Sequence, residues 1–485
     1  MDYDAIVIGS GMGGLASASV LAARGLKTLI VERNPTHGGY LASFRRGGYL
    51  FDSSIDCIAG AGPGGLITKL LDLNGAVDSV KFVPIEPVRL SIFPDFQIPV
   101  DSTTEAYEDR LKRLFPHESA GIAALIKSME RMFSAMMLVT ELSQHNFLNS
   151  GGGFNSGAAS EIARLQDISY GEFLRGYVND SRLVAALSDR CPFTGLPPTG
   201  VSALTMVTLI MSYFHFGAYR AIGGTQRVAD ALVKGIRQKG GAAITGAAAR
   251  RIILDGARAV GVVLDNGAQY QAKYIISGCD YYHTFHGLIG GEYAALAGEA
   301  IERVGVSTSF FIVYAGVSGL AGPPASSIGY FPSYDIEEIF AGGIDSTIGI
   351  TVATVEDPGR APAGGHTVVL HEMVNGEKFT IDRRRAAEIA LKKTGCVLSC
   401  ELSLPKLIET AIPSTLTYYT GNRAGAAFGW RQGPGYRGKI PINAIENLYM
   451  AGHWDDMGGG VLAAAHSGVR AANRILQREG LASID

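Results

Sequence analysis

The fold is decided by residues 4–32, which read DAIVIGSGMGGLASASVLAARGLKTLIVE. The first five residues predict a buried strand of a parallel sheet, because four apolar side chains follow one another. The turn GSGMGG comes next, and residues 15–24 have the apolar spacing of a helix. A second strand, residues 27–31, leads into Glu32. Strand, glycine turn, helix, strand and acidic residue in this order predict a site for an adenine dinucleotide.

The residue types of this segment suit a dinucleotide for physical reasons. Gly9 permits the tight turn, Gly11 lets the backbone approach a pyrophosphate, and Gly14 lets helix and strand pack closely. Free N–H groups and a partial positive charge at the helix N-terminus attract the phosphates. Glu32 follows Gly14 by 18 residues, where a carboxylate accepts hydrogen bonds from the adenosine ribose and disfavours a 2′-phosphate. These residues alone fit NAD as well as FAD, and an ordinary glycine-rich strand–helix turn is the alternative.

Further glycines after Glu32 distinguish between FAD and NAD as the expected dinucleotide. Gly38 and Gly39 follow the acidic residue closely, and the stretch GGYLFD stands at 47–52. This arrangement resembles the flavin-dependent oxidoreductases of the phytoene desaturase, carotenoid isomerase and retinol saturase family. The resemblance implies a glutathione-reductase-like fold and FAD as the cofactor. Tyr40 departs from the family, in which Arg commonly follows the paired glycines.

The C-terminal part of the chain has the same resemblance. Residues 447–452 predict a short strand that runs into a turn, and residues 461–476 predict an alanine-rich helix. In the resembling family this is the second flavin segment, where the helix N-terminus stabilises the negative charge of the reduced flavin. His453 stands where the family usually has Asp. The cofactor residues that the resemblance implies are Gly9, Gly11, Gly13, Gly14, Glu32, Arg33, Gly38, Gly39, Tyr40, Ala249, Gly452, His453, Gly459, Gly460 and Val461.

The length of 485 residues is too great for one core and predicts two or three domains. The order of the motifs predicts an α/β fold. In it, a Rossmann-like FAD-binding domain is interleaved with a substrate domain made of a mixed β-sheet and a helical lid. We expect the FAD-binding domain at 1–80, 218–295 and 436–485, the substrate-binding domain at 81–115 and 296–435, and the helical lid at 116–217.

Charge and hydropathy limit the partners of the chain. The formal net charge of −3 gives no electrostatic case for nucleic acid. Charged residues make up 18%, below the roughly 25% of an average soluble chain, while hydrophobic residues make up 47%. This balance suits apolar ligands or a membrane surface, although a large core alone also explains it. Because the N-terminal apolar strand is short and is preceded by Asp2 and Asp4, we expect no signal peptide and a cytoplasmic protein, with peripheral membrane contact as the alternative.

Residues 191–219 contain no Asp, Glu, Lys or Arg. A membrane span needs about 20 strongly apolar residues, whereas this apolar run is shorter and includes Ser and Thr. We therefore expect a buried helix that lines a ligand cavity, with a face that dips into a membrane as the alternative. No spacing of Cys and His predicts a metal site.

The chemistry of the site follows from the cofactor that the resemblance implies. A flavin accepts or donates hydride at its N5 atom. The resembling family desaturates, saturates or isomerises polyenes, isoprenoids and retinoids, so we expect an FAD-dependent oxidoreductase that acts on C–C bonds of an apolar substrate. Oxygen or a quinone would serve as a diffusible electron acceptor. The alternatives are a flavin amine oxidase-like enzyme acting on a C–N bond and a non-catalytic flavin-binding accessory protein.

Catalytic and substrate-binding side chains are sparse in the sequence. His453 and Asp455 are the acid–base candidates, because the resemblance places their loop near the flavin and histidine titrates near neutral pH. A cofactor contact for His453 and a helix-capping role for Asp455 are the alternatives. Core or surface positions suit His215 and His371 better than a role in the site. The candidate substrate contacts are the aromatic residues Tyr418, Tyr419, Trp430 and Phe214.

Overall fold

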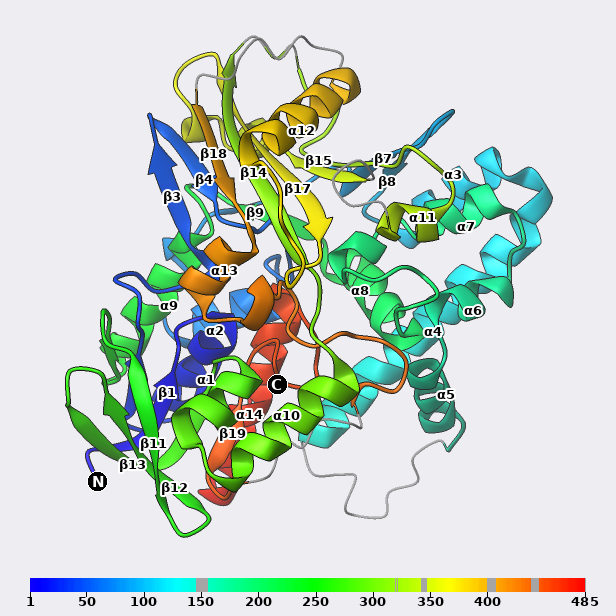
Figure 1. Cartoon of the computed structure of the whole chain (residues 1–485). Helices are drawn as coiled ribbons and strands as arrows, with labels where there is room; N and C mark the ends of the chain where they lie inside the picture. The colour runs from blue at the N-terminus through cyan, green and yellow to red at the C-terminus, as the bar shows by residue number, and fades with distance from the viewer. Residues whose placement is uncertain are drawn as a thin grey trace.

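The computed structural model describes residues 1–144, 156–318, 320, 322–341, 347–398, 407–437 and 445–484. It confirms the α/β fold class, since two seven-stranded sheets and the helices around them make up most of the molecule. One sheet lies at the bottom of Figure 1 and the other at the top, with the helices of residues 104–216 beside them.

The first sheet contains the predicted dinucleotide-binding strands. Its strand order is β10-β2-β1-β13-β12-β11, and β19 pairs with β13. The strands β1, β2, β10, β13 and β19 run parallel, and β11 and β12 form an antiparallel extension. The run of four apolar residues in β1 is buried as expected. The strands are β1 (Tyr3–Ile8), β2 (Thr28–Val31), β10 (Ala242–Ile244), β11 (Ala249–Asp255), β12 (Arg258–Leu264), β13 (Gln269–Ser277) and β19 (Leu448–Met450).

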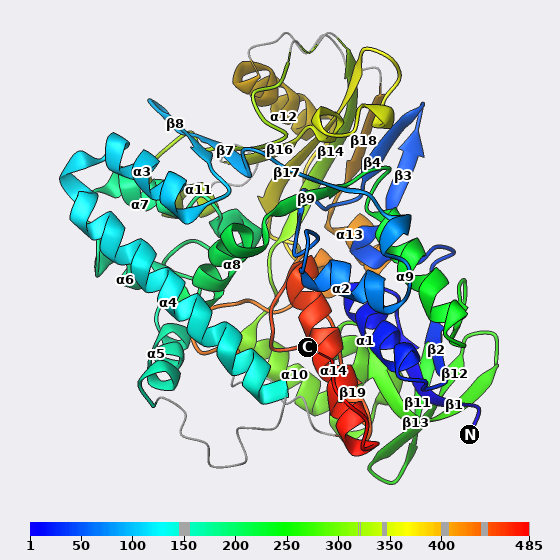
Figure 2. The ribbon, with the colours of Figure 1, turned by 180° about the vertical axis from the view of Figure 1, so that it is seen from behind.

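The two ends of the chain pack directly against each other beside this sheet. Figure 2 shows α1 (Met12–Ala23), α2 (Leu66–Leu73) and α14 (Val461–Arg478) side by side. A Cβ atom on Gly468 would lie 2.2 Å from the carbonyl oxygen of Gly13, so only glycine permits this approach of α14 to α1. The helix α9 (Gln226–Gln238) joins the same hydrophobic core. The opening and closing motifs of the sequence therefore belong to one body.

The second sheet has the order β18-β14-β17-β16-β15-β7-β8 and is mostly antiparallel; only β15 and β7 pair in parallel. Buried alanines of α12 (Arg383–Val397) pack with its apolar side chains in one hydrophobic cluster. This sheet is the mixed β-sheet that the fold class predicted from the sequence includes. Its strands are β7 (Arg89–Ile92), β8 (Gln97–Val100), β14 (Ser309–Ser318), β15 (Ser327–Tyr330), β16 (Ile348–Thr351), β17 (Gly365–Val374) and β18 (Leu407–Ala411).

A helical region stands beside the second sheet and has a hydrophobic core of its own. As expected from residues 191–219, α8 (Ala203–Phe216) is largely buried. No helix in the described part of the chain is long and apolar enough to cross a membrane. The other helices of this region are α3 (Thr104–Leu114), α4 (Ser119–Gln144), α5 (Ser156–Asp167), α6 (Tyr170–Arg175) and α7 (Ser181–Leu187).

Buried ion pairs tie the second sheet to the first half of the chain. The guanidinium of Arg360 pairs with Asp52 at 2.6 Å and with Asp357 at 3.0 Å. Asp52 also accepts a hydrogen bond at 2.8 Å from the backbone N–H of Thr225, just before α9. This network joins the GGYLFD stretch, which carries part of the resemblance, to Gly223 and Thr225 just before α9.

Smaller elements complete the fold. The strands β3 (Ser43–Arg46) and β4 (Tyr49–Asp52) form a hairpin, and β5 (Ile58–Ala59), β9 (Ala218–Ala221) and β6 (Phe82–Pro84) form a three-stranded sheet. The remaining helices are α10 (Glu292–Val304), α11 (Ile336–Ala341) and α13 (Pro413–Thr420). The domain division expected from the sequence stays a proposal, supported by the sheet that each segment joins.

Candidate functional site

A cavity of about 680 Å³ is lined by residues from both large sheets. This volume lies within the range of small-molecule and cofactor sites. All fifteen cofactor residues predicted from the sequence line the cavity, although they come from both ends and the middle of the chain. Their individual roles remain proposals, but their convergence on one cavity is a structural fact. We call the part around the glycine turn the nucleotide end and the part around the second sheet the substrate end.

The glycine turn at the nucleotide end suits a pyrophosphate. Gly11 is the N-cap of α1 and no side chain caps the helix, so its first N–H groups are available to a ligand. A Cβ atom on Gly11 would meet no atom within 4 Å, because the residue borders the open cavity. A Cβ atom on Gly13 would instead lie 2.4 Å from the backbone nitrogen of Gly452. Gly11 therefore leaves space for a ligand, and Gly13 lets the two flavin segments touch.

The Glu32 carboxylate lies at the rim of the same turn and is buried. One oxygen accepts hydrogen bonds from the backbone and hydroxyl of Ser10 at 2.9 and 2.7 Å. The other accepts from the backbone and side chain of Asn34 at 2.8 and 3.0 Å. The carboxylate thus holds the turn in shape. A ribose hydroxyl that binds Glu32 would share an oxygen with these donors or replace the Asn34 side chain.

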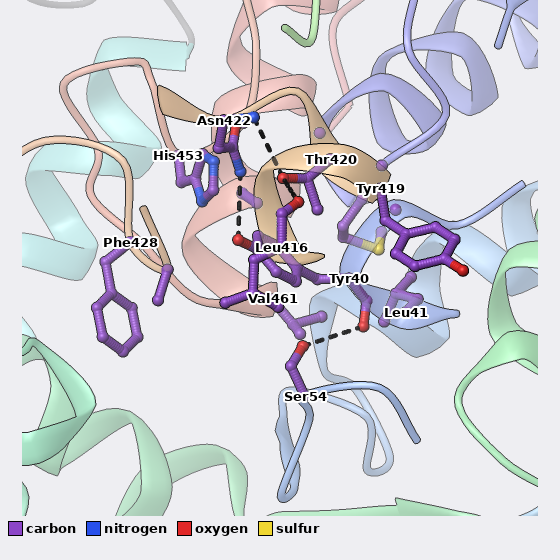
Figure 3. Close-up of a pocket in the computed structure, with 18 of the residues that line it drawn as sticks. Tyr40, Leu41, Ser54, Leu416, Tyr419, Thr420, Asn422, Phe428, His453 and Val461 are labelled. Carbon is purple, nitrogen blue, oxygen red and sulfur yellow. Dashed lines mark hydrogen bonds between the residues drawn. The ribbon is translucent and has the colours of Figure 1, made fainter. Parts of the chain in front are cut away.

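The N-terminus of α14 forms the opposite wall. Gly460 is its N-cap, with no side-chain cap and no acidic residue in the first turn, so free N–H groups lie beside Val461 at the cavity. Figure 3 shows Val461, His453 and Tyr40 grouped around this part of the cavity. The arrangement offers hydrogen-bond donors and a partial positive charge to an electron-rich ligand edge. These residues fit the flavin that the sequence implies.

His453 lines the cavity between Tyr40 and Trp454, with ring centroids 5.8 and 5.9 Å away. Burial lowers the pKa of His453 to about 4, and a hydrogen bond with the backbone of Ala427 opposes this shift. The imidazole is therefore neutral at physiological pH. This state suits a hydrogen-bonding contact with a cofactor, and it does not suit donation of a proton from imidazolium.

Tyr40 and two tryptophans build the wall behind His453. The Tyr40 hydroxyl donates to the carbonyl oxygen of Ala426 at 2.9 Å, and Asn422 accepts from the Trp454 indole at 2.8 Å (Figure 3 shows Tyr40 and Asn422). The indole of Trp430 donates to the carbonyl oxygen of Trp454 at 2.8 Å, and Trp430 is fully buried. Trp430 does not line the cavity, so its predicted contact with a substrate is corrected to a supporting position in the wall.

Asp455 also lies outside the cavity lining. Its carboxylate accepts hydrogen bonds from Ser467 at 2.7 Å and from Arg470 at 2.5 Å, and Arg470 pairs with Asp456 as well. Ser467 in turn accepts from the backbone N–H of Gly452 at 3.0 Å. Asp455 therefore fixes the loop that presents His453 against α14, instead of reaching reacting atoms as the catalytic prediction expected.

The two adjacent tyrosines of α13 are exposed and contact residues of the nucleotide end through their backbone. Tyr418 is 73% exposed and does not line the cavity, whereas Tyr419 is 58% exposed and lines it. The backbone of Tyr419 accepts from Asn34 at 2.8 Å, and that of Tyr418 accepts from Arg33. Both tyrosines thus stand at the nucleotide end, because α13 packs over the residues that follow β2.

Phe214 on α8 packs against Tyr107 in the helical core, with ring centroids 5.5 Å apart, and does not reach the cavity. Its neighbours Leu209 and Tyr213 on the same helix do line it. The prediction that this helix lines a cavity is confirmed, but the chosen residue was wrong by one position. Helical periodicity without knowledge of the packing partner does not identify which face meets the ligand.

The substrate end is mostly apolar. It is formed by β14, β16, β17, α8 and the loop before β19, which place Phe310, Ile312, Leu209, Ile350, Met373 and Phe428 on its walls. Asp56, Arg89 and His371, which carry charged or titratable side chains and were not assigned to the site by the sequence analysis, also line it. An arginine inside the apolar run VRLSIF (88–93) was the available signal for Arg89. Asp56 and His371 had no comparable signal.

Comparison with known proteins connects this geometry with a family. The family model described as flavin containing amine oxidoreductase matches residues 12–476. The chloroplastic prolycopene isomerase of Arabidopsis thaliana is 27% identical over 504 residues, which cover 99% of this chain and 83% of the isomerase. The neurosporene-forming phytoene desaturase of Rhodobacter capsulatus is 26% identical over 515 residues, covering 97% of this chain and 93% of the desaturase.

A solved structure supports the fold. An oxidoreductase from Methanosarcina mazei superimposes with a TM-score of 0.68 at 21% sequence identity, covering 96% of this chain and 99% of the other. At this identity the similarity concerns the fold alone. It extends over both sheets and the helical region, because nearly the whole length of each chain is matched.

Proposed function

The chain belongs to the family of flavin-containing amine oxidoreductases, and from this premise we propose that it acts on C–C bonds of an apolar, polyene-like substrate. The cofactor is FAD. The observation that carries the proposal is the single cavity, which continues from the dinucleotide turn to an apolar chamber. Prolycopene and phytoene, named in two relatives, are molecules of this apolar kind.

The fifteen cofactor residues would hold FAD in two groups. The uncapped start of α1 and the glycine turn would bind the pyrophosphate, and Glu32 would bind the adenosine ribose. The uncapped start of α14 at Val461 would face the electron-rich edge of the flavin. Neutral His453 and the hydroxyl of Tyr40 would complete the polar contacts there, in place of the Asp and Arg common in the family.

When bound, the flavin supplies hydride acceptance or donation at N5. The side chains of the substrate end would hold an extended carbon chain in place and exclude water from it. Holding the carbon chain and excluding water require no imidazolium in the site, which agrees with the neutral state of His453. We include desaturation, saturation and isomerisation in the proposal, with oxygen or a quinone as a diffusible electron acceptor.

A polyene has very low solubility in water and resides in membranes or micelles. We therefore propose that the protein meets its substrate by peripheral contact with a membrane. The low fraction of charged residues, 18%, supports this part of the proposal. A flotation assay with phosphatidylcholine–phosphatidylglycerol vesicles tests it: the protein should float with vesicles that contain carotenoid, and recovery of all protein in the bottom fraction would contradict it.

An amine substrate is the rival that the family name keeps open. The substrate end contains the buried guanidinium of Arg89, whose positive charge would repel an ammonium group. The carboxylate of Asp56 would attract an amine, but both of its oxygens already accept hydrogen bonds, from Thr351 at 2.7 Å and from Ser327 at 2.5 Å. The chamber therefore favours the apolar substrate.

Anaerobic incubation of the purified flavoprotein with two substrate classes tests the proposal. Micellar phytoene and prolycopene form one class, and putrescine and benzylamine form the other. We expect a change in the polyene composition by chromatography in the dark, and no bleaching of the flavin by either amine. Bleaching by an amine together with unchanged polyenes would contradict the proposed function.

A further inference from the structure

Arg89 on β7 is a buried cation that faces the cavity without a protein partner. It is 3% exposed and lines the substrate end. Within the described part of the chain, its Nε atom is buried and has no hydrogen-bond partner, and no carboxylate lies within ion-pair distance of the guanidinium. Its nearest aromatic contact is the ring of Phe193, whose centroid is 4.8 Å from Cζ. Buried polar groups normally have partners, so this one requires an explanation.

The acidic groups around Arg89 are occupied by other donors. Asp189 accepts from Ser91 at 2.6 Å and from Arg190 at 3.5 Å. Asp56 accepts from two hydroxyl groups, as described above. Burial lowers the pKa of Arg89, and Asp189 and Asp56 act in the opposite direction, yet an arginine side chain remains protonated in a protein. A charged guanidinium with an unused donor at Nε therefore stands in the wall of the cavity.

A glycine makes room for this guanidinium. Gly329 on β15 pairs with Ser91 on the neighbouring β7 (Figure 1). A Cβ atom on Gly329 would lie 2.3 Å from Nη2 and 2.9 Å from Cζ of Arg89. The guanidinium thus packs closely against the backbone of Gly329 at the wall of the cavity. A larger residue at 329 would displace it.

A second polar group without a partner lies at the same end. The Nε2 atom of His371 is buried and has no hydrogen-bond partner in the described residues, and His371 lines the cavity. The two residues come from different strands, β7 and β17, of the same sheet. Both residues line a chamber that is mostly apolar, and the Asp56 carboxylate there is already occupied by two hydroxyl donors. A plain hydrocarbon would leave both groups unsatisfied.

We propose that Arg89 determines substrate specificity by binding a carboxylate at one end of the apolar chain. The planar guanidinium presents paired N–H groups that match the two oxygens of a carboxylate, and a hydroxyl group satisfies fewer of them. His371 is placed to add a hydrogen bond to the same group. This inference rests on the proposed function and narrows it: among apolar, polyene-like substrates, an isoprenoid or polyene acid is preferred to a hydrocarbon of the same length.

Two ligands that share one C20 chain test the proposal. The purified flavoprotein is titrated anaerobically with all-trans-retinoic acid and with all-trans-retinol, and binding is followed by the change in flavin absorbance. We expect the acid to bind about 10- to 100-fold more tightly, the range for hydrogen bonds to a charged group. The Arg89→Met variant should lose most of this preference while it retains its affinity for retinol.

Two further variants separate binding from folding. Gly329→Ala keeps the charge but displaces the flexible end of Arg89, so it should weaken acid binding in the same direction as Arg89→Met. Arg384→Met removes an arginine whose side chain is 91% exposed and should change neither affinity. Flavin content and melting temperature are measured for each variant to check that it folds. If Arg89→Met does not fold, the binding result for Gly329→Ala tests the proposal in its place.

The results distinguish the two proposals. Equal affinities of the wild type for acid and alcohol, or equal losses of both in Gly329→Ala, would overturn the role of Arg89 and leave the proposed function intact. A flavoprotein that binds neither retinoid and is bleached by amines would overturn the proposed function and the role of Arg89 together.

Discussion

The two ends of the cavity are built in different ways. The nucleotide end consists mainly of glycines, helix N-termini and the Glu32 carboxylate, and residues 9–32 supply its glycine turn and this carboxylate. The substrate end consists of single side chains from β7, β14, β16, β17 and α8. A phosphate is recognised by backbone geometry, which a short segment can specify, whereas an apolar chain is recognised by the shape that several distant elements form together.

Replacing Gly13 would break the nucleotide end most severely. The Cβ atom of Gly13→Ala would lie 2.4 Å from the backbone of Gly452, which joins the two flavin segments. We expect complete loss of bound flavin and a destabilisation of about 4 kcal/mol, since neither backbone can move freely. Urea unfolding and flavin absorbance measure both effects.

Gly11→Ala is the matched control, because its Cβ atom would meet no protein atom and its φ of −66° suits alanine. The stability of the apoprotein should change by less than about 0.5 kcal/mol, while FAD binds more weakly because the methyl group occupies the ligand space. Equal destabilisation by both substitutions would contradict the difference assigned to these glycines.

Arg360→Met should break the buried network that joins β4, the segment before β17 and the start of α9. It leaves the buried carboxylates of Asp52 and Asp357 without their cation. Removing one partner of a buried ion pair costs about 3 kcal/mol or more, and we expect this loss in the free energy of unfolding measured with urea. The exposed Arg384→Met should cost less than about 0.5 kcal/mol. A neutral effect of Arg360→Met would show that the network contributes no stability.

One histidine at each end of the cavity should make the stability of the protein depend on pH. His453 at the nucleotide end and His371 at the substrate end each have a pKa lowered to about 4 by burial. The unfolded chain binds these protons near pH 6.5 and the native state near pH 4, so stability falls as the pH decreases from 6.5 to 4. For the two histidines together we expect the free energy of unfolding to fall by about 2 kcal/mol. This loss is smaller than the pKa shifts alone would give, because both rings face the cavity and are partly screened by solvent.

Urea midpoints at pH 7, 5.5 and 4.5 measure this loss. Replacement of His371 by Gln should reduce the slope between pH 6.5 and 4.5 and leave the region above pH 7 unchanged. A stability that increases on acidification would contradict the neutral state of the two histidines in the native protein.

The smallest effect is expected for Tyr418. It is exposed and outside the cavity, so Tyr418→Ala should leave kcat/KM for a converted polyene within about twofold and stability within about 0.5 kcal/mol. Phe428→Ala, by contrast, enlarges the substrate end and should raise KM by about tenfold, the result of losing roughly 1.5 kcal/mol of apolar contact. If Tyr418→Ala has the larger effect of the two, the assignment of the substrate end is wrong.

This contrast also explains what the sequence could predict. The strands and helices around the glycine turn were predicted with errors of a few residues at their ends, because the motif fixes strand, turn and helix locally. The same is true of β19 and α14. The fold class followed from these segments and from the order in which they recur.

The side chains that line the substrate end could not be predicted as well from the sequence. Trp430 and Phe214 were chosen as aromatic residues near the right segments, but Trp430 belongs to the wall behind the cavity and Phe214 points into the helical core. Arg89 was missed because its role depends on the cross-strand glycine at 329, which a linear pattern does not reveal. Side chains selected by tertiary packing require the fold before they can be named.

The central claim is that the opening glycine turn and the closing helix bind one FAD molecule. The most direct test is the flavin content of the purified protein, measured by absorbance and by chromatography of the cofactor released on denaturation. We predict a yellow protein that releases one FAD per chain. A colourless protein that takes up no FAD from excess ligand, or that binds NAD in its place, would contradict the claim.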